Sequence, residues 1–383
     1  MKIIIVDNEN LEKSFIELPV QLIYKNDANY IRPLDKDIQE VFDKKKNKFF
    51  RHGVCERWIL EHEGKYIGRL AVFVNKKYVQ EQPTGGIGFF ECIHDQKAAH
   101  FLFDQAKEWL SKQGMVAMDG PINFGERDRW WGLLVNGFEE PLYCMNYNPP
   151  YYQELFESYG FQVYFNQLCF GMDVSTPLSE KMVKWHDYYS KHPDFSVKHI
   201  EVNKLESFAE DFCTIYNKAW AKHGGGKTME LKQAKLLFYS MKQVIDEKIA
   251  WFVYHKDEPI AMWINIPDLN QYFKHFKGKF GFLQKMYFLY LKLTGACKRF
   301  VGIVYGVVPE WQGKGTDAYM IGECGKMVQP NRLYDKYEMQ WIGDFNPKMV
   351  NLAHNLEAIE VRRLSTYRYL FDRNKEFKRH PML

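Results

Sequence analysis

The clearest hydrophobic pattern of the chain is a dense run of β-branched and aromatic residues over Phe300–Val308, which predicts a long, buried strand. Pro309 and Glu310 end this run. The residues that follow are rich in glycine, and from Thr316 onward the apolar positions recur with a helical period. The pattern therefore predicts a strand, a glycine turn and a helix in succession.

Alternating and helical periods also order the first half of the chain. The predicted helices are Leu34–Lys44, Gln96–Lys112 and Tyr151–Tyr159, and the predicted strands are Lys2–Val6, Cys55–His62, Tyr66–Val74, Ile87–Ile93, Met115–Met118 and Gln162–Met172. Ser14–Tyr24 shows no clean period and receives no assignment. The charged and aromatic segment Gly120–Glu140 is predicted to be an irregular loop that forms either a binding rim or a covered surface.

The second half repeats this order of elements. Its predicted helices are Lys204–Ala221, Glu230–Ile245, Phe280–Leu293, Asp317–Met327 and one that Asn346 opens, and its predicted strands are Val197–Val202, Ala250–His255, Pro259–Pro267, Phe300–Val308, Tyr337–Ile342 and Arg362–Phe371. The halves share element order more than residues, which indicates a diverged duplication. We expect domains at residues 1–174 and 195–383, joined by a linker helix within residues 175–194.

Composition narrows the class of protein. The 383 residues include 46% apolar and 16% aromatic residues, enough for two cores. No apolar run approaches the length of a membrane span, and the N-terminus turns acidic too soon for a secretory signal. Seven scattered cysteines without paired spacing predict a cytoplasmic protein. A net charge of +4 is small for this length, so nucleic acid is not an expected partner.

A glycine turn between a strand and a helix is suited to binding phosphate, because backbone N–H groups and the helix N-terminus both attract an anion. The turn resembles the pyrophosphate loop of the GNAT (GCN5-related N-acetyltransferase) superfamily. The matching residues are Gln312, Gly313, Lys314, Gly315 and Thr316. Asp317 stands where the family has a small residue, and its carboxylate repels a pyrophosphate unless it points away or caps the helix. A plain glycine turn before an Asp-stabilised helix is the alternative.

The resemblance implies an α/β protein of two GNAT-like domains in tandem, each with a mixed, mostly antiparallel sheet flanked by helices. It also implies an N-acyltransferase that takes acetyl-CoA or another acyl-CoA as co-substrate and acts on a small-molecule or peptide amine. The pantetheine would lie along Val307 and Val308, with Lys314 near a phosphate and Asn346 at the following helix. The first half has His94–Gln96 in place of a glycine turn, so we expect it to bind no coenzyme A.

The proton-transfer residues of the family are missing from their usual positions. The position of the general base falls on Gly306–Val308, and that of the tyrosine acid falls on Ala353. Glu338, a lone carboxylate in an apolar strand, is the candidate base, with an outward-facing strand residue as the alternative. This absence favours a second hypothesis, a GNAT-fold binding or regulatory protein without turnover. A third is an aminoacyl or peptidyl transferase that uses a charged RNA.

Two further segments bear on the acceptor. Gly224–Thr228 lacks the strand and the first glycine of a Walker motif. It is interpreted either as an acceptor lid, with His223 and Lys227 as contacts, or as an ordinary helix linker. The aromatic stretch Tyr272–Tyr290 is an insertion relative to a minimal GNAT domain, and we interpret it as core that could wall an acceptor pocket. The histidines show no metal spacing, so no metal site is expected.

Overall fold

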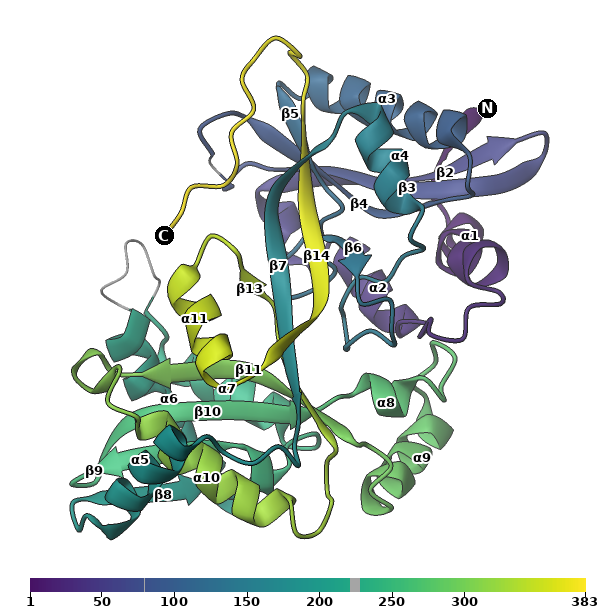
Figure 1. Cartoon of the computed structure of the whole chain (residues 1–383). Helices are drawn as coiled ribbons and strands as arrows, with labels where there is room; N and C mark the ends of the chain where they lie inside the picture. The colour runs from purple at the N-terminus through teal and green to yellow at the C-terminus, as the bar shows by residue number, and fades with distance from the viewer. Residues whose placement is uncertain (79, 221–227) are drawn as a thin grey trace.

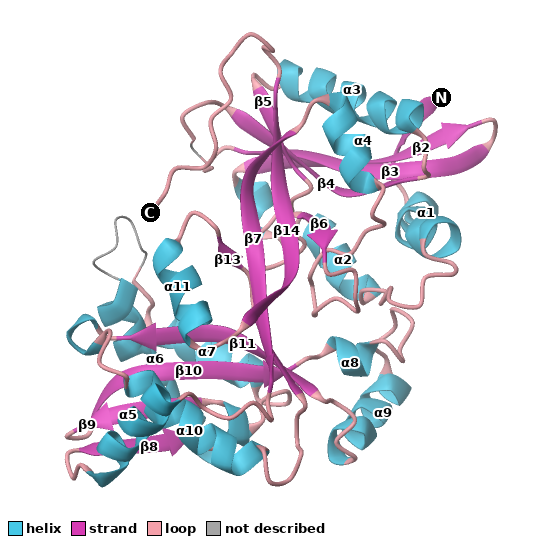
Figure 2. Cartoon of the chain, viewed as in Figure 1, coloured by secondary structure: helices cyan, strands magenta, loops and turns pink. Residues whose placement is uncertain are grey.

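The structure is a computed structural model that describes residues 1–78, 80–220 and 228–383. Its strands form one sheet in the order β1-β2-β3-β4-β5-β14-β7-β12-β11-β10-β9-β8, with β6 and β13 paired at its side. Helices flank the sheet in both halves (Figure 1, Figure 2). The fold is therefore a mixed α/β architecture, as the sequence predicted.

The first half runs from β1 to β7. Its elements are β1 (Lys2–Ile5), α1 (Glu9–Leu18), α2 (Asp35–Phe42), β2 (Gly53–His62), β3 (Lys65–Asn75), β4 (Thr84–Cys92), α3 (Gln96–Lys112), β5 (Ala117–Gly120), β6 (Leu133–Asn136), α4 (Tyr152–Tyr159) and β7 (Gln162–Asp173). Helices α3 and α4 pack over the sheet through Phe90, Phe103 and Phe156. The linker then forms α5 (Glu180–Lys191).

The second half repeats the series. Its elements are β8 (Phe195–His199), α6 (Leu205–Trp220), α7 (Leu231–Met241), β9 (Trp251–His255), β10 (Glu258–Pro267), α8 (Asn270–Phe273), α9 (Phe282–Leu293), β11 (Arg299–Val307), α10 (Thr316–Val328), β12 (Lys336–Met339), β13 (Ile342–Gly343), α11 (Pro347–Asn355) and β14 (Ile359–Leu370). The parallel pairs are β4 with β5 and β11 with β12, and the other pairs are antiparallel.

The two long strands β7 and β14 are shared by the halves. Strand β14 ends the second half in sequence, yet it pairs with β5 of the first half. Strand β7 ends the first half, yet it pairs with β12 of the second. Along most of their length β7 and β14 pair with each other, and Figure 1 shows them running side by side between the two groups of strands. The boundary near residue 174 thus divides the chain but not the sheet.

Two details differ from the sequence prediction. The segment without an assignment contains the second half of α1, which Asn8 caps by accepting the N–H of Leu11. Its buried residues Phe15, Ile16 and Leu18 lie in its last turn, so a helix of this length shows no repeated period. The closing strand predicted for the second domain is β14, and the structure inserts it between β5 and β7 because hydrogen-bond pairing acts over any distance in sequence.

Candidate active site

Strands β11 and β12 separate and open the sheet at Gly302. Their parallel pairing extends only from Arg299 to Gly302, after which β11 continues to Val307. A side chain at Gly302 would collide with the hydroxyl of Tyr337, so glycine is needed at the point of separation. Beyond it, one edge of β11 has no strand partner among the residues that the structure describes. We call this opening the fork.

A cavity of about 300 Å³ fills the fork. Ile303, Val304 and Tyr305 of β11 line it, together with side chains of α10 and α11. A second, mostly apolar cavity of about 570 Å³ lies where α5 crosses α10, and it is called the α5–α10 cavity below. The residues that line both cavities are Trp263, Ile321, Tyr337 and Leu356. The two spaces are therefore neighbours across a single layer of side chains.

The glycine turn adopts the geometry that the sequence predicted. Gly313 and Gly315 have φ angles of 72° and 73°, and Gly315 is the N-cap of α10. Within the described residues, the N–H groups of these two glycines have no hydrogen-bond partner. Gln312 fastens the turn by donating from Nε2 to the carbonyl of Val307 over 3.1 Å. Free N–H groups at a helix N-terminus fit an anion such as pyrophosphate.

Helix α5 covers one side of this turn. The ring of Trp185 occupies the space where a side chain at Gly315 would stand. The hydroxyl of Tyr189 donates to the carbonyl of Lys314 over 2.6 Å, and the Lys314 ammonium lies 5.0 Å from the ring centre of Trp311. The linker helix thereby fixes the turn against α10.

Asp317 lies in the first turn of α10, as the sequence requires. Burial raises the pKa of its carboxyl, while contacts with its own N–H and that of Ala318 act in the opposite direction. Gly315, not Asp317, is the N-cap of α10, and an acidic residue in the first turn is favoured by the helix dipole. When ionised, Asp317 still places a negative charge beside the N–H groups of the turn.

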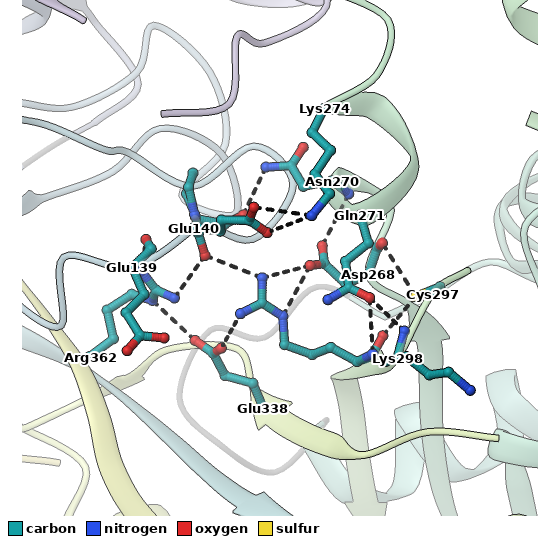
Figure 3. A network of polar contacts seen from close by, with 12 residues as sticks. Glu139, Glu140, Asp268, Asn270, Gln271, Lys274, Cys297, Lys298, Glu338 and Arg362 are labelled. Atoms are coloured by element: carbon teal, nitrogen blue, oxygen red, sulfur yellow. Dashed lines mark hydrogen bonds and ion pairs between the residues drawn. The ribbon is translucent and has the colours of Figure 1, made fainter. Parts of the chain in front are cut away.

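Glu338 is held in a buried network of charges (Figure 3). Its Oε1 accepts from Arg362 Nε over 3.1 Å, and its Oε2 accepts from Arg299 Nη1 over 3.4 Å. Arg299 also pairs with the buried Asp268, and both arginines donate to the carbonyl of Glu140 in the first half. The alternative of an outward-facing residue does not match this burial. A carboxylate with both oxygens engaged by guanidiniums is poorly placed to accept a proton.

The other residues that the sequence predicted to contact the co-substrate or the acceptor lie in several elements. Asn346 caps α11 by accepting the N–H of Met349 over 3.3 Å. Val307 and Val308 are buried, and the N–H of Val308 donates to Ile260. Thr316 is also buried, in the first turn of α10. The two acceptor-loop residues predicted from the sequence, His223 and Lys227, lie outside the described residues.

Asp128 was not singled out as a site residue in the sequence. It belongs to the irregular loop Gly120–Glu140, which the sequence predicted as either a binding rim or a covered surface. The structure places it, exposed, among the residues that line the fork cavity. Among the described residues that line this cavity, Asp128 is the one with a carboxylate side chain. Only the contact between the halves brings this loop to the fork, and local sequence carries no signal of that contact.

Neither a metal cluster nor a membrane-spanning helix is found where the structure is described. No group of three or more His, Cys, Asp or Glu side chains there could hold a metal ion. No helix in the same ranges has both the length and the apolar character needed to cross a bilayer.

The sequence matches no family model but is similar to two curated proteins. It is 24% identical over 375 residues to "Bacterial ceramide synthase" of Caulobacter vibrioides (strain NA1000 / CB15N), with 93% of this chain and 94% of that protein covered. It is also 24% identical over 370 residues to "Protein YghO" of Escherichia coli (strain K12), with 94% and 93% covered.

Solved structures resemble the fold at low sequence identity. A tandem GNAT protein from the clavulanic acid biosynthesis pathway has a TM-score of 0.54 at 8% identity and covers 97% of this chain and 98% of its own. A GCN5-related N-acetyltransferase from Sphaerobacter thermophilus has a TM-score of 0.51 at 10% identity, with 96% of both chains covered. With 96–97% of this chain covered, the likeness extends over both halves.

Proposed function

Because the chain has the tandem GNAT fold, we propose that it is an acyl-CoA-dependent N-acyltransferase that uses a long acyl chain. The observation that carries the proposal is the fork, with the α5–α10 cavity directly beyond it. An acetyl group would leave the larger cavity unused. A volume of about 570 Å³ with a mostly apolar lining suits a flexible hydrocarbon chain.

The co-substrate would follow the open edge of β11. In this arrangement the pyrophosphate contacts the free N–H groups of Gly313 and Gly315 at the N-terminus of α10. The pantetheine lies along the open edge of β11 over Ile303–Gly306, and the thioester reaches the point of separation at Gly302. The acyl chain then continues past Trp263 and Tyr337, which line both cavities. Acetyl-CoA, the simplest ester, is the short-chain alternative.

The acceptor that we propose is a long-chain amine. One relative is named a ceramide synthase, and a ceramide is the amide of a long-chain amino alcohol. The same amide-forming chemistry applies to the unidentified amine that the family resemblance implies. The proposal keeps the cytoplasmic location predicted from the scattered cysteines, all seven of which are free.

The reaction needs little beyond positioning and one proton acceptor. The neutral amine attacks the thioester carbonyl, the C–N bond forms, the C–S bond breaks, and coenzyme A leaves as a thiolate. The amine nitrogen gives up one proton, for which the Asp128 carboxylate in the lining of the fork cavity is the candidate acceptor. Holding both reactants in the fork supplies most of the acceleration, because a thiolate is a good leaving group.

The test pairs two substitutions on α11. Leu352 lines the fork cavity, whereas its neighbour Asn351 is exposed. We expect Leu352→Trp to fill the cavity and abolish binding of palmitoyl-CoA, measured by calorimetric titration, and Asn351→Trp to leave it unchanged. Amide formation from palmitoyl-CoA and sphinganine, followed by thiol release and mass spectrometry, should show the same pattern.

The controls decide among the hypotheses. Circular dichroism confirms that both variants are folded. If the wild type binds no acyl-CoA, or if Leu352→Trp binds as the wild type does, the proposed site is wrong. Salt-sensitive retention of charged RNA in place of acyl-CoA would favour the aminoacyl or peptidyl transferase.

A binding protein without turnover is the second candidate. Asp317 favours it, because a carboxylate in the turn weakens the hold on the pyrophosphate. Acyl-CoA binding without thiol release, over a range of long-chain and short-chain amines, would support this candidate over the transferase.

A further inference from the structure

Helix α9 presents an apolar face to solvent. Leu293, Phe282 and Leu283 are 88%, 77% and 76% exposed. The other exposed apolar side chains of the helix are Met286, Tyr287, Leu289 and Tyr290. The aromatic pattern of this insertion predicted core, but only part of the insertion is buried. A soluble helix normally turns its apolar side inward, so this exposed face needs a partner.

The helix is firmly attached, so its exposed face has a fixed direction. Phe288 and Leu291 are buried, and the Phe288 ring packs edge-on against Tyr272 at 5.0 Å between ring centres. At the end of the helix, Lys292 donates to the carbonyls of Gln243 and Ile245, just after α7. Figure 1 shows α8 and α9 together at one side of the molecule, away from β7 and β14.

The surrounding sequence is strongly basic. Between Asp268 and Glu310 there is no acidic residue, whereas seven lysines and arginines occur. Lys277 and Lys285 form no ion pair within the described residues, and Lys285 is exposed on α9 itself. An apolar helix face with free lysines is complementary to a surface that is apolar inside and negatively charged outside.

A lipid bilayer fits this surface better than a second copy of the chain. A symmetric dimer would place the same acid-free, basic segment against itself, and like charges would oppose the contact. With twelve residues, α9 is about 18 Å long, too short to cross a membrane but sufficient to lie in its interface. Tyr287 and Tyr290 suit the boundary between acyl chains and headgroups.

Helix α7 also has exposed apolar residues. Its residues Leu236 and Tyr239 are 63% and 53% exposed, and Lys292 joins the end of α9 to the segment after α7. We propose that the α9 face docks the protein peripherally on an anionic membrane surface. This inference is independent of the proposed catalytic activity, although it would bring the enzyme to a lipid acceptor.

The test is co-sedimentation of the full chain with vesicles. One set contains equal parts of phosphatidylcholine and phosphatidylglycerol, and the other contains phosphatidylcholine alone. We expect the wild type to bind the anionic vesicles and to lose most binding in about 0.5 M salt, because salt screens the lysine contribution. The double variant Leu283→Gln, Leu293→Gln should bind at least about tenfold more weakly, since two exposed apolar anchors are removed.

A matched control removes exposed apolar residues elsewhere. Ile5 and Val116 are 55% and 43% exposed in the first half, and the double variant Ile5→Gln, Val116→Gln should bind vesicles as the wild type does. Equal binding by wild type and the α9 variant would overturn the proposal, as would wild type that binds neither vesicle. A dimer in light scattering that the α9 variant converts to a monomer, without vesicle binding, would instead make this face a self-association surface.

Discussion

Two carboxylates near the fork differ in their surroundings. Glu338 is 4% exposed and lies between two arginines, so its charge is already balanced. Asp128 is exposed, lies in a loop and lines the fork cavity. A buried, doubly paired carboxylate stabilises the contact between the halves, whereas an open one at a cavity is available to a substrate amine.

Asp128 is the first residue to test for proton transfer. We expect Asp128→Asn to lower kcat for amide formation by roughly 100-fold or more, the usual loss for a proton acceptor, with little change in acyl-CoA affinity. Glu126→Gln, an exposed carboxylate in the same loop outside the cavity lining, should retain activity. Steady-state kinetics on both variants checks this, and equal rates for Asp128→Asn and wild type would exclude Asp128 as the acceptor.

Asp317 should make binding of the co-substrate depend on pH. Burial raises the pKa of its carboxyl above 3.8, so the neutral form is favoured in the fold and its contribution to stability is lost as pH rises through the raised pKa. The ionised form also repels a pyrophosphate. We expect dephospho-CoA to bind more tightly at pH 5 than at pH 8, and Asp317→Asn to bind roughly tenfold more tightly at pH 8 with a flat pH profile.

Dephospho-CoA is the suitable ligand for this titration, because it lacks a phosphate monoester that would itself titrate near pH 6. The control is Glu310→Gln, which removes an exposed carboxylate just before the turn and should change affinity much less. An unchanged pH profile in Asp317→Asn would show that the carboxylate points away from the bound pyrophosphate.

At the scale of elements, helix α5 contacts two parts of the candidate binding site. It covers the glycine turn through Trp185 and Tyr189, and it forms one wall of the α5–α10 cavity through Met182 and Val183. The sequence predicted only a linker helix. Because α5 packs against α10, this linker between the halves also forms part of the candidate binding site.

The length of the acyl chain should therefore depend on α5. Val183 lines the cavity and is 45% exposed, so a larger side chain can enter the cavity without a forced rearrangement of the core. We expect Val183→Trp to reduce kcat/KM for palmitoyl-CoA by roughly 10- to 100-fold and to leave that for acetyl-CoA nearly unchanged. Tyr188→Trp, on the same helix but outside the lining, is the control. A parallel loss with both esters would argue against an acyl site there.

At the scale of the whole molecule, the exchange of β7 and β14 predicts that the halves unfold together. Tyr367 of β14 is 1% exposed, packs against Phe156 and donates to Glu157 over 2.7 Å, both in the first half. Tyr367→Ala should lower the free energy of unfolding by about 3–5 kcal/mol. Tyr367→Phe, which loses only the hydroxyl contact, should lower it by about 1 kcal/mol.

The measurement is urea unfolding followed by circular dichroism and by tryptophan fluorescence. Coincident transitions by the two probes are expected in the wild type and in both variants, because β14 is part of the sheet in each half. Two separate transitions, with only one shifted by Tyr367→Ala, would mean that residues 1–174 and 195–383 are independent folding units.

Local patterns determined most of the elements and the glycine turn. Helix α3 has the predicted bounds, and β11, the turn and α10 follow one another as their hydrophobic periods indicate. These features depend on residues close in sequence: the side-chain period, the freedom of Gly313 and Gly315 at positive φ, and Asp95 as the N-cap of α3. The same features gave the resemblance to the GNAT superfamily.

Contacts between residues far apart in the sequence could be known only from the tertiary structure. The exchange of β7 and β14, the arginine partners of Glu338 and the position of Asp128 at the fork all join residues more than 20 positions apart. The outward face of α9 is another case, because an aromatic helix has the same composition in a core and on a surface. The local sequence sets the hydrophobic period of each element and the residues of its turns. Burial and strand pairing depend on which element, distant in sequence, packs against it in the fold.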